Sequence, residues 1–413
     1  MLNTLTTKII LAGHLVLWPL LLRAAPDEIR MGLADGYPVC QSIINRMECR
    51  VGSFSNAKGR KVARAQQTKY LKKISAKKDE INNLNYLNEY LEAYLNQQKT
   101  TGLLIIKNGE IIFEKYQYER DKSMQMRAFS MSKTIIAILI GIAHQKGFIH
   151  SLDDIASKYY KDLEGSEYGA TTIRNLLQMS SGVKFTEEYS GNKETDFVKF
   201  NSRLNDVSRS NRKSAEAFTL FNHREFKQGT RFNYASIETE VLCRILKYST
   251  RSSISALTEQ WLWLPMGAES EGYWLLNGTE ADENCGGGFL ATVRDYGRLG
   301  ILLANDGAVG EQQVIPRDYL MLATNAKSQR EAFKPKRATS YLGYGYQTWI
   351  FPMEVRAFGL IGIYGQSLFV QPASGIVMVE TGVYDMPSDQ QALRKKMQLW
   401  KFTLDSLGGF SKE

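Results

Sequence analysis

Ser130 and Lys133 are two residues of this sequence whose types and spacing could do chemistry. Residues i and i+3 share one face of a helix, so the hydroxyl and the amine can meet there. A serine becomes a useful nucleophile beside a base, and a lysine is a base only when its pKa is lowered, for instance by burial. The apolar run 133–143 predicts a helix buried on every side, which would supply that burial. A serine at the N-terminus of this helix also lies beside free N–H groups that stabilise developing negative charge.

The Ser-x-x-Lys pattern does not select Ser130 by itself, because a single copy is more typical of a surface serine. The pattern occurs six times, starting at Ser55, Ser75, Ser130, Ser181, Ser190 and Ser210. Only the copy at Ser130 follows a predicted hairpin and opens a fully apolar helix. This context favours Ser130 as the nucleophile.

Tyr234 is a candidate partner for this pair, because it follows a glycine turn in the segment Gly229-Thr-Arg-Phe-Asn-Tyr234-Ala-Ser236. A tyrosine can relay a proton when a neighbouring cation stabilises its phenolate. A core aromatic residue is the alternative interpretation of Tyr234 taken alone.

Strands near both ends of the chain, with helices between them, predict how these residues are positioned. The helical period of residues 79–98 predicts an amphipathic helix, and Asn108-Gly109 between two β-rich runs predicts a hairpin. The C-terminal part predicts strands at 345–350, 357–361, 367–371 and 376–380, and then a helix at 388–405. We therefore expect an α+β fold, with one antiparallel sheet from the N- and C-terminal strands, flanking helices and an inserted mainly helical lobe.

The net charge of +9 is concentrated in one segment. Nine of the 52 Lys and Arg residues lie in 57–78, which has no acidic residue, so the rest of the chain is balanced. This basic arm could contact an anionic envelope surface, and a solvated basic face is the alternative. No zinc-finger spacing or aromatic-interleaved basic motif indicates nucleic-acid binding.

The first 25 residues are typical of an export signal or a membrane anchor, because Lys8 precedes an apolar run at 9–22. We expect a periplasmic protein, retained at the inner membrane if this segment is not cleaved. The predicted organisation is a signal or anchor at 1–25, an extension with the basic arm at 26–78, and a hydrolase domain at 79–413.

The four cysteines predict one disulfide and no metal site. Cys40 and Cys49 lie close together and could pair in an oxidising compartment, with two free thiols as the alternative. Cys243 fits a helical core position, and Cys285 has no Cys or His at ligand spacing. The four histidines are scattered, so we expect no metal and no other cofactor.

Several motifs in a fixed order resemble the class C β-lactamase and penicillin-recognising serine hydrolase superfamily. They are Ser130-x-x-Lys133, Tyr234-Ala-Ser236, residues 51–55, 172–182, 294–300 and 343–349, and the stretch Gly362-Ile-Tyr-Gly-Gln366. The likeness spans about residues 50–385 and is strongest to the 6-aminohexanoate-dimer hydrolase branch.

The resemblance implies roles for individual residues. The motif serine of this superfamily forms an acyl-enzyme while a lysine and a tyrosine transfer its proton, which matches Ser130, Lys133 and Tyr234. The oxyanion hole would combine the N–H of Ser130 with that of Ile363. Three further residues match substrate-binding positions, namely Tyr189, Ser236 and Gly362, although packing or surface exposure suits Tyr189 equally well.

Two departures from the superfamily pattern bear on the substrate. Leu360-Ile361-Gly362 stands where Lys/His-Thr-Gly is usual, and Ser236 stands where lactamases often have asparagine. The missing polar group disfavours substrates with a carboxylate and favours a neutral small-molecule ester or linear amide. A cell-wall D,D-peptidase or β-lactamase, and a non-catalytic binding protein on the same scaffold, remain as alternatives.

Overall fold

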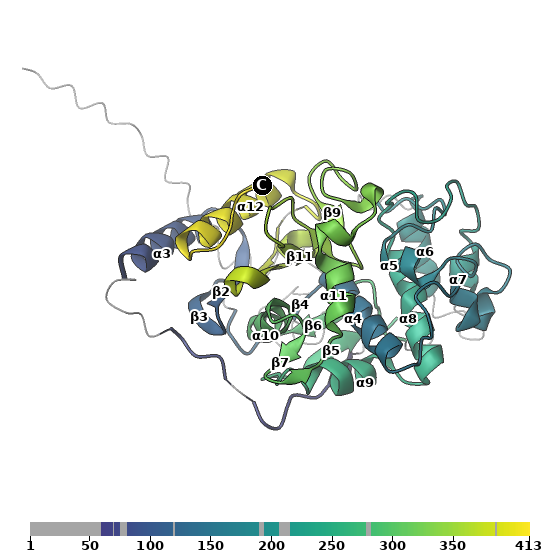
Figure 1. Cartoon of the computed structure of the whole chain (residues 1–413), viewed down its shortest axis with the longest axis horizontal. Helices are drawn as coiled ribbons and strands as arrows, with labels where there is room; N and C mark the ends of the chain where they lie inside the picture. Colours follow the sequence, from purple (N-terminus) through teal and green to yellow (C-terminus); the bar gives the residue numbers. More distant parts are fainter. Residues whose placement is uncertain are drawn as a thin grey trace, which may run out of the picture.

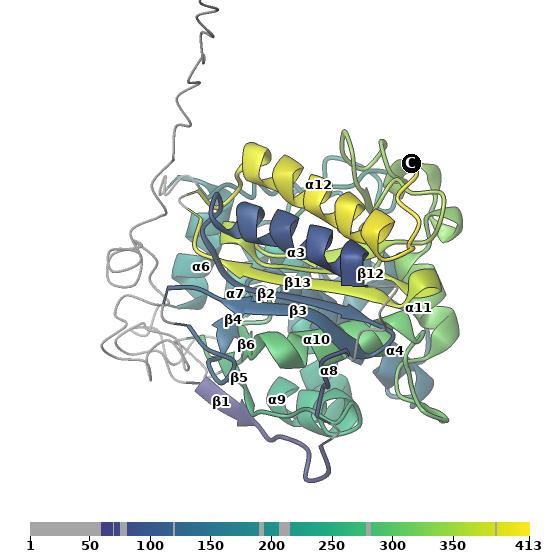
Figure 2. The same ribbon diagram turned by 90° about the vertical axis from the view of Figure 1, so that its left-hand side faces the viewer.

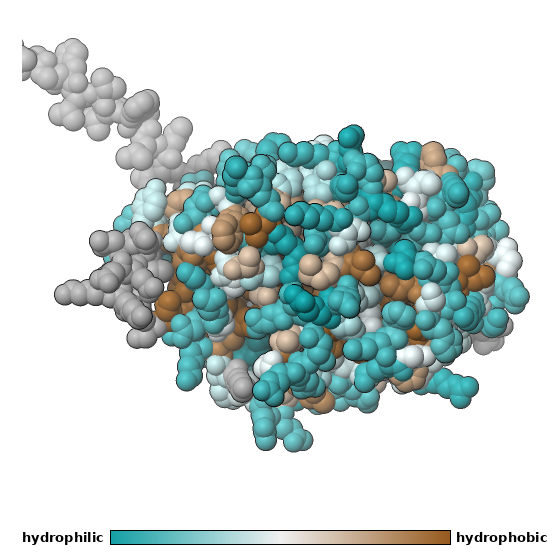
Figure 3. Space-filling model, viewed as in Figure 1, coloured by the Kyte–Doolittle hydropathy of each residue, from teal (hydrophilic) through white to brown (hydrophobic). Residues whose placement is uncertain are grey.

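A computed structural model describes residues 59–413, apart from 69, 75–80, 119, 190–193, 206–214, 278–281 and 385. The predicted signal segment and the predicted Cys40–Cys49 pair lie outside the described residues. Within the described residues, no helix is long and apolar enough to cross a membrane. The face of the molecule in Figure 3 is mainly hydrophilic, with apolar side chains scattered between polar ones.

A seven-stranded antiparallel sheet joins the two ends of the chain, as the sequence predicts. The strand order is β3-β2-β13-β12-β11-β10-β9. The N-terminal hairpin consists of β2 (Thr100–Lys107) and β3 (Glu110–Tyr116), which turn at Asn108 and Gly109, both with positive φ. The C-terminal strands are β11 (Phe358–Ile361), β12 (Ser367–Gln371) and β13 (Ile376–Gly382), and β13 pairs with β2.

The predicted strand at 345–350 is wrong, because this stretch is mostly a turn. Gln347 has a left-handed φ of 50°, which no strand allows. The chain instead forms a tight hairpin of β9 (Gly343–Tyr344) and β10 (Trp349–Ile350), with Trp349 paired to Tyr344. The hairpin stacks Trp349 on Tyr234.

Helices cover both faces of the sheet. Helices α3 (Ile81–Leu95) and α12 (Gln390–Ser406) lie side by side on one face (Figure 2). Their apolar side chains pack with Leu103, Ile105 and Phe369 from the strands. Helices α4 (Met131–Gln145) and α10 (Val293–Ala304) belong to the larger core on the other face.

The inserted helical lobe lies beyond α4, at the right of Figure 1. Its helices are α5 (Ile173–Leu177), α6 (Asp196–Leu204), α7 (Ala215–Thr219) and α8 (Ser236–Thr250). Two further helices, α9 (Ile254–Thr258) and α11 (Arg317–Thr324), come later in the chain. The lobe packs α8 against α4, so the loop that enters α8 reaches the start of α4.

A second, four-stranded sheet was not expected from the sequence. Its strands are β1 (Gly59–Val62), β5 (Gly272–Leu275), β6 (Phe289–Ala291) and β4 (Met126–Arg127), in that order. β1 comes from the basic arm, and its Arg60 and Lys61 form ion pairs with Glu283 and Glu271. Part of the expected N-terminal extension is therefore built into the globular unit. An anionic surface as its partner stays a prediction.

Candidate active site

Ser130 lies at the N-cap of α4, at the base of a pocket. The preceding residue, Phe129, has a left-handed φ of 47°, a conformation that non-glycine residues adopt only when their surroundings hold them in it. The Ala128 N–H donates to Phe289 of β6 at 2.7 Å, which fixes this sharp approach to the helix. The first turn of α4 therefore places the Ser130 hydroxyl at the pocket wall.

Lys133 meets Ser130 as the i, i+3 spacing predicts. Its Nζ lies 3.0 Å from Ser130 Oγ and donates to the Gly286 carbonyl oxygen at 2.6 Å. The side chain is 2% exposed, and this burial lowers the lysine pKa from 10.5 to about 8, although Glu187 and Glu240 act in the opposite direction. A substantial fraction of the amine is therefore neutral near pH 8.

Tyr234 lies on the loop before α8, with its hydroxyl hydrogen-bonded to Ser130. Its ring stacks on Trp349 at a centroid distance of 5.7 Å, and Lys133 Nζ lies 5.3 Å from the ring centre. Burial, reinforced by the negative charge of Glu187, raises the pKa of Tyr234 well above its usual value, while the hydrogen bond from Ser130 opposes that rise. The environment therefore favours the neutral, proton-donating form of the tyrosine over the phenolate.

Gly362 and Ile363 follow β11 and line the same pocket. A Cβ atom on Gly362 would lie 2.4 Å from the Ala128 carbonyl oxygen, so only glycine lets the strand end approach the Ser130 loop this closely. The backbone N–H groups of Ser130 and Ile363 have no hydrogen-bond acceptor among the described residues. Of the two apolar residues before Gly362, Leu360 is buried in the core and Ile361 lines the pocket.

Glu187 is a pocket residue that sequence reasoning missed. Its carboxylate accepts hydrogen bonds from the Tyr189 hydroxyl at 2.6 Å, the Ser236 N–H at 2.7 Å and the Ser236 hydroxyl. Tyr189 lines the pocket as predicted, whereas Ser236 lies behind Glu187 and outside the pocket lining. Contact between Ser236 and substrate stays a prediction. Glu187 belongs to no motif identified in the sequence. Its position two residues before the candidate Tyr189 was the signal that could have suggested it.

The pocket has a volume of about 520 Å³ and runs from Ser130 to the start of α12. Trp349, Ile361, Ile363 and Leu393 form apolar parts of its wall. Lys396 is the cation among the described lining residues, and it forms a buried ion pair with Glu380. The described lining therefore offers no uncommitted cation to bind a substrate carboxylate.

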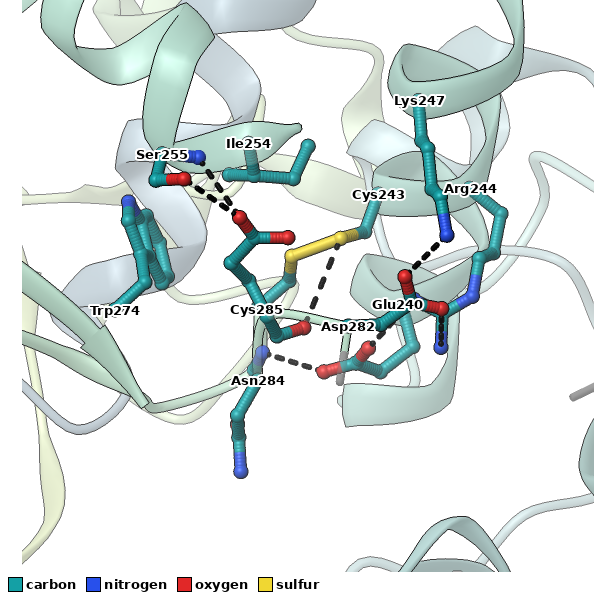
Figure 4. The surroundings of a disulfide bond; sticks show 12 residues. Glu240, Cys243, Arg244, Lys247, Ile254, Ser255, Trp274, Asp282, Asn284 and Cys285 are labelled. Atoms are coloured by element: carbon teal, nitrogen blue, oxygen red, sulfur yellow. Dashed lines mark hydrogen bonds and ion pairs between the residues drawn. A yellow bond between two sulfur atoms is a disulfide. The ribbon is translucent and has the colours of Figure 1, made fainter. Parts of the chain in front are cut away.

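A disulfide joins α8 to the loop before β6 (Figure 4). The same loop contains Gly286, whose carbonyl oxygen accepts the hydrogen bond from Lys133. Cys243 and Cys285 are the bonded pair, which corrects the expectation of a simple core cysteine and an isolated one. They are 42 residues apart, and only the packing of the loop against α8 brings them together. The next residue, Gly286, accepts from Lys133 with its carbonyl, and its N–H donates to Glu240 at 2.8 Å.

The disulfide also occupies the one group of metal-ligand atoms found among the described residues. That group consists of Glu240, Cys243 and Cys285. The two sulfur atoms are bonded to each other, and a thiolate is the form that binds metal. This cluster therefore does not form a metal site in the oxidised protein.

The antiparallel sheet between helical layers, with the Ser-x-x-Lys helix beneath it, is a β-lactamase/transpeptidase-like fold. Residues 87–391 match the Beta-lactamase family model, and the chain belongs to this family of serine hydrolases. The solved structure of a provisionally named 6-aminohexanoate-dimer hydrolase from Bacillus anthracis superposes with a TM-score of 0.71 at 21% identity, covering 88% of this chain and 93% of that one.

Two further comparisons bear on the branch and on the fold, respectively. A 6-aminohexanoate-dimer hydrolase of Paenarthrobacter ureafaciens is 23% identical over 301 residues, which cover 72% of this chain and 76% of that protein. A family VIII carboxylesterase shares the fold at a TM-score of 0.57 and 14% identity, covering 81% of this chain and 100% of that one. The predicted resemblance and fold class are confirmed.

Proposed function

We propose that this hydrolase cleaves a carboxylic ester or a linear amide through an acyl-enzyme on Ser130. The observation that carries the proposal is the 3.0 Å contact between Ser130 Oγ and the buried Lys133 Nζ. The contact faces a pocket of small-molecule size, and the pKa of that lysine is lowered to about 8. A non-catalytic binding protein has no need of a buried lysine beside a serine, because burying its charge is costly.

In the acylation step, Ser130 Oγ attacks the substrate carbonyl carbon and its proton passes to neutral Lys133. The Gly286 carbonyl takes one N–H of the amine, which leaves the lone pair free to face the serine. Collapse of the tetrahedral intermediate breaks the bond to the leaving alcohol or amine, which receives a proton from Tyr234. Lys133 then returns its proton to the tyrosine. The raised pKa of Tyr234 suits this role, because the residue is protonated when the leaving group needs a proton.

Deacylation uses the same groups with water as the nucleophile. Lys133 accepts the water proton as the water oxygen attacks the acyl carbon. Collapse of the tetrahedral intermediate breaks the bond to Ser130 Oγ, which takes a proton from Tyr234, and Lys133 then returns its proton to the tyrosine as the carboxylic acid leaves. In both steps, the negative oxygen would be stabilised by the N–H groups of Ser130 and Ile363, which are unpaired in the described part of the chain. Loss of one such donor costs about 10²–10³ in rate.

The pocket supports a neutral acyl group better than a carboxylated one. Its wall beside Gly362 is formed by Ile361, and Glu187 and Asp389 add carboxylates to the lining. A substrate carboxylate would approach these acids without an uncommitted cation from the described lining, which is unfavourable. The pocket therefore supports ester or amide hydrolysis better than D,D-peptidase or β-lactamase activity, which remain the second candidate.

We further propose that the protein is exported to the periplasm. The Cys243–Cys285 disulfide supports this location, because disulfides persist mainly in oxidising compartments. The apolar run at 9–22 after Lys8 supports it as well. Fractionation of expressing cells, with N-terminal sequencing of the exported protein, tests both the location and the cleavage of the first segment. A cytoplasmic protein with free thiols would contradict the proposal.

The activity is tested by giving purified protein a nitrophenyl ester, a linear aminohexanoate dimer and a chromogenic cephalosporin. We expect turnover of the ester or the dimer, and its loss in a Ser130→Ala variant. The matched control is Ser181→Ala, because Ser181 begins another Ser-x-x-Lys copy but hydrogen-bonds Glu238 outside the pocket. Turnover that survives in Ser130→Ala would refute the mechanism. Turnover of the cephalosporin alone would replace the proposed substrate class with lactams.

A further inference from the structure

The loop after β11 carries the proposed second oxyanion donor in a strained conformation. Its short helical turn spans Ile363–Gly365, and Tyr364 has a left-handed φ of 59°. Such a conformation is unfavourable for a non-glycine residue, because its Cβ atom crowds the backbone. The loop keeps this shape only if contacts outside it hold the backbone in place.

One of these contacts comes from a buried lysine on α12. Lys396 Nζ donates to the Gly365 carbonyl oxygen at 2.7 Å and lies 3.3 Å from a carboxylate oxygen of Glu380. The lysine is 3% exposed and the glutamate is fully buried. Lys396 also lines the pocket, so the tether reaches the loop from the side on which substrate would bind.

Glu380 is held in turn by hydroxyl groups from three other elements. Tyr94 of α3, Thr100 of β2 and Tyr384 after β13 donate to its oxygens at distances between 2.6 and 3.2 Å. The ring of Tyr384 also lies against Gly365, where a Cβ atom would be 3.1 Å from it. The carboxylate therefore fixes the position of Lys396 relative to the sheet.

We propose that Lys396, fixed by Glu380, is a positioning residue that holds loop 362–365 so that the Ile363 N–H points to the substrate oxyanion. This inference rests on the proposed function. A buried ion pair is weak support for stability, because the desolvation of two charges offsets their attraction. The ion pair instead contacts a strained loop that lines the pocket, and this location supports a functional role.

The matched variants are Lys396→Met and the double variant Lys396→Met/Glu380→Gln. The single variant leaves a buried carboxylate without its cation, which is destabilising, whereas the double variant removes both charges and should regain thermal stability. The control is Arg298→Met on α10, which breaks a buried ion pair with Asp295 away from the pocket. The control reports what the loss of a buried charge does to activity by itself.

The readouts are kcat and KM for the ester and the affinity of a boronic acid, whose serine adduct places a tetrahedral anion in the oxyanion hole. We expect both Lys396 variants to lose roughly 10- to 100-fold in kcat, with KM within about twofold. Boronate affinity should fall by the same factor as kcat/KM. The control should keep its kcat, and the double variant should recover stability without recovering kcat.

Two results would overturn the inference. One is wild-type kcat and boronate affinity in the double variant. The other is an equal loss of kcat in the Arg298→Met control at the same loss of thermal stability. An inactive wild-type protein would refute the proposed function and this inference with it, whereas full activity of both Lys396 variants would refute the inference alone.

Discussion

The dependence of the reaction on pH should follow the ionisation of Lys133. The amine must be neutral to accept the serine proton, and its pKa is about 8. We therefore expect kcat/KM to fall about tenfold for each pH unit below that value. At pH 7 about 10% of the amine would be neutral, against about 0.03% for a lysine with the ordinary pKa, so burial raises the reactive fraction roughly 300-fold.

A change of one pocket charge should move this pH dependence in a defined direction. The negative charge of Glu187 raises the pKa of Lys133, so Glu187→Gln should shift the acid limb to lower pH. The matched control is Asp389→Asn, which removes a carboxylate from the same pocket while an asparagine can still cap α12. The control should leave the midpoint of the limb in place.

The assay is kcat/KM for a neutral nitrophenyl ester between pH 5 and 10, because this ratio reports ionisation of the free enzyme. The ester itself carries no titrating group in that range, so the limb belongs to the protein. A profile that is flat down to pH 6 would refute Lys133 as the base. An equal shift in Glu187→Gln and Asp389→Asn would refute the specific influence of Glu187 on that lysine.

Three further predictions concern stability and the site's backbone. Burial raises the pKa of Glu238 to about 8, so folding is favoured while the residue is protonated, and its contribution to stability is lost progressively as pH rises from about 4.5 to 8. Glu238→Gln should therefore unfold at a higher temperature than wild type at pH 8 but not at pH 4.5 in thermal melts, and equal melting curves at pH 8 would contradict this. Gly362→Ala should lose about 10²-fold in kcat, because its Cβ atom would meet the Ala128 carbonyl oxygen. Gly287→Ala is the control, since a Cβ atom there fits without a close contact, and comparable ester kinetics in the two variants would refute the close approach. The disulfide closes a loop of 42 residues, so its reduction should lower the free energy of unfolding by about 4 kcal/mol, measured with denaturant. Reduction should also lower kcat, because the loop carries the Gly286 carbonyl that binds Lys133. A reduced protein with unchanged stability and kcat would contradict both effects.

The contact between Ser130 and Lys133 and the main sheet could be predicted from local patterns. The i, i+3 spacing of Ser130 and Lys133 depends only on helix geometry, and the Asn108-Gly109 turn specifies its hairpin directly. The order of elements then places strands from both ends of the chain in one sheet, as observed. These features need no knowledge of the packing between distant segments.

The features that the sequence did not reveal depend on long-range packing. The Cys243–Cys285 bond requires a loop to fold back on α8, and no spacing rule relates the two cysteines. The partner of Lys133 is a backbone carbonyl, which any residue at position 286 would carry. The turn at Gln347 was missed because the surrounding aromatic and β-branched residues favour a strand.

Covalent labelling tests most directly whether Ser130 is the nucleophile. Purified protein is treated with a fluorophosphonate at pH 8, where a substantial fraction of Lys133 is neutral, and the labelled peptide is identified by mass spectrometry. We expect one phosphonyl group on Ser130, slower labelling in Lys133→Met, and none in Ser130→Ala. A label on any other residue, or unchanged labelling of Ser130→Ala, would contradict this role of Ser130.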